Sequence, residues 1–159
     1  MLNFNAAGLL TPPLGIESTL NEFEECFAVD SPENVRKILY GRYINYKNNL
    51  KDLCNNSELR QWIDGSFVTK KPNPFDIDLV TFIDFEIAEE KGQELKDFIY
   101  PSSSINYGLD GYIVVIYPET HKLHFAYRAD CSYWINQFDK TKPNRSRKRI
   151  PKGFLEIII

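Results

Sequence analysis

The chain has 159 residues, 43% of them hydrophobic and 14% aromatic, and it carries a formal net charge of -3. It is long enough for one compact domain with a core, and its net charge argues against affinity for nucleic acid over the whole surface. No apolar run approaches the ~20 residues of a membrane span, and the amino terminus lacks a basic segment followed by an apolar one. We therefore expect a single domain over residues 1–159, in the cytoplasm and without membrane contact.

The amino-terminal half is predicted to contain an extended arm, two helices and a strand. Residues 1–16 are rich in glycine and proline and are expected to be extended. Ser18 is a suitable N-cap for a short helix. A longer helix is expected at about residues 31–54, because Pro32 suits the first helical position and apolar residues then recur every three or four positions. A strand is expected at residues 58–64.

The carboxy-terminal half is predicted to alternate strands with helices. The expected elements are a strand at residues 76–85, a helix at 86–99, a strand at 111–117, a helix at 119–138 and a strand at 153–159. This order predicts an α/β (α+β) fold, with helices packed on a mixed sheet of about four or five strands.

The segment from Gly65 to Val80 is the most informative part of the chain, because it joins a Gly-Ser turn to an Asp-x-Asp pair. Glycine permits a tight turn that brings backbone amides close to an anion, and Ser66 adds a hydroxyl. Asp76 and Asp78 would emerge on one face of a strand, about 6.6 Å apart at ~3.3 Å per residue. Two such carboxylates suit Mg²⁺ or Mn²⁺ beside substrate phosphates. The alternative is a solvated acidic start of a strand.

A third carboxylate is expected from Asp110, which stands at the head of the strand at residues 111–117. If that strand neighbours the one that carries Asp78, a spacing of about 4.8 Å places Asp110 within reach of a shared metal. The alternative is a turn residue, because Asp110 precedes a glycine and Asp-Gly is a strong turn signal. Asp84 shares the face of Asp76 but would lie ~26 Å away along the strand, which excludes it from the same site.

These motifs resemble the signature of the polymerase-beta-type nucleotidyltransferase superfamily, in which a Gly-Ser turn precedes Asp-x-Asp and a neighbouring strand supplies a third carboxylate. More narrowly, the chain resembles a family of small, largely uncharacterised prokaryotic proteins with this core, over nearly its whole length. The resemblance rests on the opening at residues 8–16, the motifs at 64–69 and 76–78, and the close at 151–157. It implies that Asp76, Asp78 and Asp110 are the catalytic and metal-binding residues.

The resemblance implies a Mg²⁺- or Mn²⁺-dependent nucleotidyltransferase that transfers NMP from an NTP to an RNA, protein or small-molecule acceptor. Many small members of the superfamily serve toxin-antitoxin or antiphage systems. The alternative is a catalytically silent binding or regulatory subunit that recognises nucleotide, RNA or a partner protein. No separate nucleobase-binding domain fits in 159 residues, so a partner protein or a homo-oligomer is one way to complete the site.

Two segments of the chain are candidates for binding the nucleotide phosphates. The Gly-Ser turn and its loop supply backbone amides, hydroxyls and two lysines. The basic loop at residues 139–152 supplies cations that bind a triphosphate or an RNA backbone. The alternative for the basic loop is a solvated, unengaged segment. The predicted phosphate-binding residues are Gly65, Ser66, Thr69, Lys70, Lys71 and Lys152.

Three aromatic residues of the helix at 119–138 are candidates for stacking on a base. They are Tyr127, Tyr133 and Trp134. Core packing is the alternative role, and it is expected for at least two of them.

Overall fold

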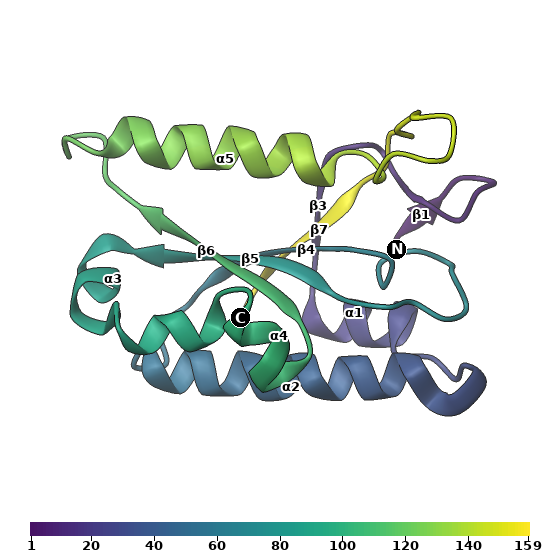
Figure 1. Cartoon of the computed structure of the whole chain (residues 1–159), viewed down its shortest axis with the longest axis horizontal. Coiled ribbons are helices and arrows are strands. Elements are labelled where there is room, and N and C mark those ends of the chain that lie inside the picture. Colours follow the sequence, from purple (N-terminus) through teal and green to yellow (C-terminus); the bar gives the residue numbers. More distant parts are fainter.

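The fold is a five-stranded mixed sheet with helices on both faces (Figure 1). The computed structural model describes residues 1–159, apart from the side chain of Pro32. The elements in chain order are β1 (Asn3–Phe4), β2 (Leu10–Thr11), β3 (Gly15–Ser18), α1 (Leu20–Phe27), η1 (Pro32–Asn34), α2 (Val35–Leu53), β4 (Arg60–Asp64), β5 (Asp78–Asp84), α3 (Phe85–Lys91), η2 (Glu94–Phe98), α4 (Ser102–Tyr107), β6 (Asp110–Ile116), α5 (His124–Phe138) and β7 (Phe154–Ile158). The predicted α/β (α+β) class is confirmed.

The strand order is β3-β7-β4-β5-β6, and it brings three carboxylates level at one end of the sheet. β4 runs antiparallel to β7 and to β5, whereas β6 runs parallel to β5. In this register Asp64 lies opposite Asp78, and Asp78 lies opposite Asp110. The strands of Asp78 and Asp110 are therefore neighbours, which is the condition stated above for a shared metal site.

The two faces of the sheet carry separate hydrophobic cores. Residues two apart on a strand share a face, so Ile63 of β4 packs in the core with α1 and α2, while Trp62 packs in the core with α5. Figure 1 shows α5 alone on one side of the sheet and the other helices on the opposite side. Asp64 shares the face of Trp62, and Asp78 shares the face of Val80. The carboxylates consequently lie on the face that α5 covers.

The amino-terminal elements differ from the expected ones in two ways. The arm at residues 1–16 contains the β1–β2 hairpin and the first residues of β3, which joins the sheet as an edge strand. The N-cap of α1 is Thr19 and not Ser18, because the Thr19 hydroxyl accepts the hydrogen bond from the backbone N–H of Glu22 at 3.1 Å. Ser18 ends β3, and its hydroxyl donates to the Glu22 carboxylate at 3.0 Å.

The helix predicted at residues 31–54 begins later, at Val35. Glu33 and Asn34 have φ angles of 57° and 54°, in the left-handed region, so residues 32–34 form a separate short turn before α2 starts. The helix ends at Leu53, close to its predicted end.

The helices of the carboxy-terminal half are shorter than predicted. The helix expected at residues 86–99 is divided into α3 and the 3₁₀ helix η2, with Gly92, a weak helix former, between them. The short helix α4 has no counterpart among the predicted elements. α5 begins at His124 and not at residue 119, because a turn closed by the bond from His121 N to Pro118 O (2.8 Å) precedes it. Among the helices that the structure describes, none has the length and apolar character that crossing a bilayer requires.

Candidate metal and phosphate site

One buried arginine holds the loop between β4 and β5, residues 65–77, which we call the Gly-Ser loop. Arg36 extends from α2 and is only 4% exposed. Its guanidinium donates to the backbone carbonyl oxygens of Phe27 (3.2 Å), Phe67 (2.9 Å), Thr69 (2.6 Å) and Lys71 (2.5 Å). The last three acceptors belong to the Gly-Ser loop. Because a charged donor forms strong hydrogen bonds, Arg36 fixes the path of the loop backbone.

The start of the Gly-Ser loop requires a glycine. Gly65 has a φ of +88°, and a Cβ at this position would lie 2.7 Å from Oδ2 of Asp78. Any other residue would be strained there and would collide with a carboxylate of the site. The Ser66 hydroxyl accepts a hydrogen bond from the Phe75 N–H at 3.0 Å, and the Thr69 hydroxyl donates to the Ser66 carbonyl at 2.7 Å. Both hydroxyls therefore close the loop, while both residues also line the adjoining pocket.

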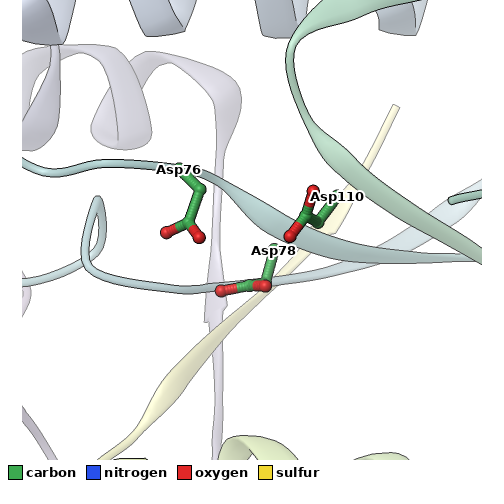
Figure 2. Close-up of side chains that lie close together, drawn as sticks. All are labelled: Asp76, Asp78 and Asp110. Atoms are coloured by element: carbon green, nitrogen blue, oxygen red, sulfur yellow. The ribbon is translucent and has the colours of Figure 1, made fainter. Parts of the chain in front are cut away.

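Asp76, Asp78 and Asp110 converge on one point (Figure 2). Each offers a carboxylate oxygen, and these three oxygens lie within 4.8 Å of one another. Asp78 and Asp110 are the first residues of β5 and β6. The strand predicted at residues 76–85 begins only at Asp78. Asp76 therefore lies in the Gly-Ser loop, two residues before β5. Asp84 is at the opposite end of β5, outside the cluster.

The cluster places carboxylates in surroundings that disfavour their charge. Burial, and then the neighbouring Asp76, raise the pKa of Asp78 to about 7. Burial and Asp76 also raise the pKa of Asp110. Burial raises the pKa of Asp64, on the adjacent strand, to about 6 even though a lysine pairs with it. Such perturbed carboxylates in a pocket are a common feature of functional sites.

The three carboxylates fit a hard divalent cation. Mg²⁺ and Mn²⁺ take oxygen ligands, and Mg²⁺ is commonly bound by a few carboxylates together with water and substrate phosphates. The convergent oxygens of Asp76, Asp78 and Asp110 form such a donor set. A bound cation would offset both the cost of burying the Asp78 charge and its repulsion by Asp76, which together raise the pKa of Asp78.

The lysines near the cluster have different roles. Lys152 is 5% exposed and its ammonium forms an ion pair with Asp64 in the wall of the pocket. Lys71 and Lys142 line the same pocket, and the positive charge of Lys142 partly offsets the rise in the pKa of Asp78. Lys70 is not brought to this pocket: its ammonium lies 4.2 Å from the ring centroid of Phe4, beside a second hollow of about 670 Å³.

The pocket has a volume of about 630 Å³ and joins an acidic wall to an aromatic one. The acidic wall consists of the carboxylates and the Gly-Ser loop. The aromatic wall is formed by α5 and by the part of β6 that follows Asp110, and it includes Tyr112, Tyr133, Trp134 and Gln137. Asp64, Tyr112 and Gln137 were not among the predicted site residues, and Lys142 was predicted only as a member of the basic loop at residues 139–152. Tyr112 could have been predicted from the sequence, because it lies two residues after Asp110 on the same strand and therefore shares its face.

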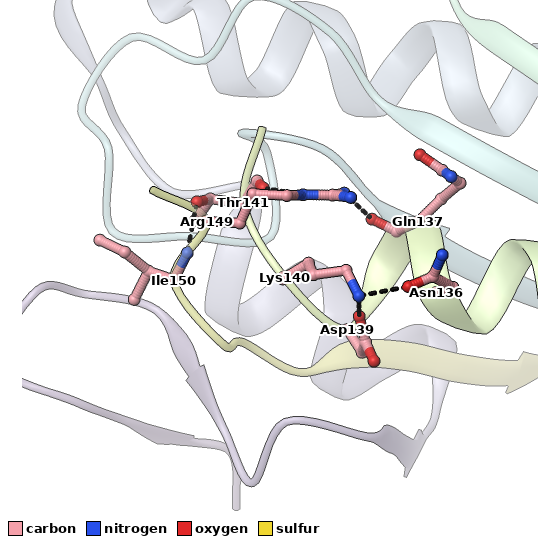
Figure 3. A network of polar contacts seen from close by, with 7 residues as sticks. All are labelled: Asn136, Gln137, Asp139, Lys140, Thr141, Arg149 and Ile150. Carbon is pink, nitrogen blue, oxygen red and sulfur yellow. Dashed lines mark hydrogen bonds and ion pairs between the residues drawn. The ribbon is translucent and has the colours of Figure 1, made fainter. Parts of the chain in front are cut away.

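The basic loop, residues 139–152, folds back on itself beside the pocket (Figure 3). Thr141 N donates to Ile150 O at 2.8 Å, and Ile150 N donates to the Thr141 hydroxyl at 3.0 Å. The Arg149 guanidinium donates to the carbonyl oxygens of Thr141 (2.9 Å) and Gln137 (3.4 Å). Arg149 is thus used to hold the loop against α5, and this anchoring presents Lys142 to the carboxylates.

The fold and the site define an α/β protein with a three-carboxylate pocket. The chain matches the model of a protein family over residues 2–158, and it belongs to that family, the family of unknown function DUF6932. No curated protein and no solved structure matches the chain.

Replacement of Arg36 is expected to loosen the Gly-Ser loop. We expect Arg36→Lys to lower the free energy of unfolding by about 2–5 kcal/mol, because hydrogen bonds to charged groups contribute about 1.5–3 kcal/mol each and one ammonium cannot serve four separated carbonyls. Denaturant titration measures this change, and amide hydrogen exchange over residues 65–77 locates it. The control is Lys37→Met, at an exposed neighbour on α2, which should cost less than about 1 kcal/mol. If amide hydrogen exchange in the Gly-Ser loop were the same in Arg36→Lys as in the unchanged protein, Arg36 would not be the residue that holds this loop.

The raised pKa of Asp78 predicts a pH-dependent stability in the absence of divalent metal. Its ordinary pKa is 3.8 and its pKa in the folded chain is about 7, so between these values the folded state binds more protons than the unfolded state. The free energy of unfolding should therefore fall as the pH rises from about 4 to about 7. In EDTA we expect a lower Tm at about pH 8 than at about pH 5, measured by circular dichroism. Asp78→Asn should flatten this slope, and added Mg²⁺ should raise the Tm at the higher pH. An identical slope in Asp78→Asn would count against a buried, proton-binding Asp78.

Proposed function

We propose that this protein is a Mg²⁺- or Mn²⁺-dependent nucleotidyltransferase. The observation that carries the proposal is the convergence of Asp76, Asp78 and Asp110 within 4.8 Å, next to the tight turn at Gly65. The resemblance of the Gly-Ser and Asp-x-Asp motifs to the polymerase-beta-type superfamily supports the same chemistry. The substrate is an NTP, and the acceptor is a hydroxyl of an RNA, protein or small molecule.

The phosphates of the NTP are held between the carboxylates and the lysines of the pocket. Asp76 and Asp78 would hold the metal, which when bound supplies positive charge to the phosphate oxygens during transfer. Lys71 and Lys142 line the pocket beside these residues and neutralise further phosphate charge. The backbone amides of the turn at Gly65 and Ser66 offer additional donors.

Asp110 is the residue that accepts the proton of the acceptor hydroxyl. The hydroxyl oxygen forms a bond to the α-phosphorus, the bond from that phosphorus to the oxygen of the β-phosphate breaks, and pyrophosphate leaves. The hydroxyl proton passes to the carboxylate of Asp110, which lies next to the carboxylates of Asp76 and Asp78. A positioned carboxylate can act as a general base in such a transfer.

Removal of one carboxylate should abolish transfer. We expect the unchanged protein to transfer label from at least one α-³²P-NTP to total RNA or protein in the presence of Mg²⁺, and Asp78→Asn and Asp110→Asn to reduce the transfer to background. Asp84→Asn is the matched control, because Asp84 is exposed at the other end of β5; it should retain transfer. EDTA should stop the reaction of the unchanged protein.

The rival function is a catalytically silent module that binds nucleotide, RNA or a partner protein. It predicts NTP binding without metal-dependent transfer, and equal binding in Asp78→Asn. That combination of results would overturn the proposed nucleotidyltransferase activity and favour the function of a binding module.

A further inference from the structure

The path of the chain returns the end of α5 to the carboxylate cluster. β6 starts with Asp110 at the cluster and runs away from it along the sheet. α5 follows β6 and runs back over the same face (Figure 1). Its last turns therefore lie above the carboxylates, and Tyr133 and Gln137 both line the pocket. These two residues are four apart, so they share one face of the helix.

Tyr133 has an accessible ring, unlike the other two aromatic residues that were candidates for stacking. Trp134 is half-buried against Tyr112, at 4.4 Å between ring centroids. Tyr127 is partly buried and packs against the core between α5 and the sheet, and its hydroxyl accepts a hydrogen bond from Arg60 at 3.1 Å. Tyr133 is 57% exposed and meets the ring of Trp134 edge to face, at 5.2 Å. Trp134 thus supports Tyr133 from one side and leaves its ring open to a ligand in the pocket.

Gln137 offers the polar group of the same wall. Its backbone carbonyl accepts from Arg149, and its side-chain amide extends away from the Arg149 guanidinium (Figure 3). Among the described residues, no hydrogen-bond partner of this amide is found. A glutamine amide presents one donating and one accepting group, which is the pattern that pairs with the edge of a nucleobase.

We propose that Tyr133 and Gln137 form the nucleobase subsite of this pocket, with Tyr133 stacking on the base and Gln137 contacting its edge. The inference rests on the proposed function, because it assumes that the carboxylates bind the phosphates of the same ligand. A nucleotide is the ligand class that needs a metal and phosphate site at one end and an aromatic ring with an amide at the other. The pocket volume of about 630 Å³ lies within the range of about 300–1,000 Å³ for small-molecule sites. One chain then supplies both halves of the site, without a separate base-binding domain.

The test compares ligands with and without a base. Titration calorimetry in Mg²⁺ measures the binding of inorganic tripolyphosphate and of the four non-hydrolysable α,β-methylene nucleoside triphosphates. We expect Tyr133→Ala to weaken binding of the preferred analogue roughly 5- to 150-fold, the range for loss of one stacking contact, and to leave tripolyphosphate binding unchanged. Tyr133→Phe keeps the ring and should bind as the unchanged protein does. Phe125→Ala is the matched control, since Phe125 is 69% exposed on α5 and outside the pocket.

Each outcome separates the subsite from the site as a whole. Equal affinity of the unchanged protein for tripolyphosphate and for every analogue, or an equal loss of both in Tyr133→Ala, would overturn the subsite while the phosphate site stands. Failure to bind either ligand would overturn the proposed function together with the subsite.

The role of Gln137 has its own readout. Gln137→Met keeps the size of the side chain and removes its hydrogen-bonding groups, so we expect the affinities for the four bases to converge. The proposed contact of Gln137 with the base would be overturned if Gln137→Met kept the preference for one base. It would also be overturned if the unchanged protein bound all four bases equally well.

Discussion

The bonds from Arg36 to the backbone of the Gly-Ser loop are the interaction on which the site depends. This loop has no regular structure of its own, so its carbonyl oxygens need partners from elsewhere. Arg36 supplies them from α2, a helix whose apolar face is packed in the core on the other side of the sheet. The packing of α2 therefore sets the path of the loop from Phe67 to Lys71 through Arg36, and the bond from the Phe75 N–H to the Ser66 hydroxyl holds the loop next to Asp76. The core and the site form one structural unit for this reason.

The cluster of carboxylates is held together against its own repulsion. Three strands meet in a register that places Asp64, Asp78 and Asp110 side by side. Lys152 pairs with Asp64, but burial still raises the pKa of Asp64 to about 6, and burial together with Asp76 raises the pKa of Asp78 to about 7. The charges of these two carboxylates are therefore incompletely compensated within the protein. An arrangement that costs folding free energy in the isolated chain is the kind of strain that binding a cation relieves.

The sequence predicts those features that follow from local periodicity, and it misses those that depend on packing. Strands β4 to β7 were expected because alternation and turn signals are local. The pairing of the strands of Asp78 and Asp110 is non-local and entered only as a condition for a shared metal site, which the fold meets. Arg36 was missed because a charged residue inside an apolar helix pattern is ordinarily read as exposed, and only the tertiary fold brings four carbonyls to it. Lys70 and Lys71 are adjacent in sequence, yet only Lys71 lines the pocket of the carboxylates, while both line the second hollow. The pairing of Lys152 with Asp64, 88 residues away, likewise leaves no local signal.

The balance of charge in the pocket explains why the basic loop belongs to the site. Asp64 is already paired with Lys152, which leaves Asp76, Asp78 and Asp110 to hold a cation. In the proposed complex with an NTP, one divalent cation would not neutralise three carboxylates and a triphosphate together, so further positive charge would be needed beside the phosphates. The anchored basic loop brings Lys142 to that place, and the Gly-Ser loop brings Lys71. The chain has a net negative charge, but Lys71, Lys140 and Lys142 line this pocket beside the carboxylates. They supply the local positive charge that the proposed anionic ligand requires.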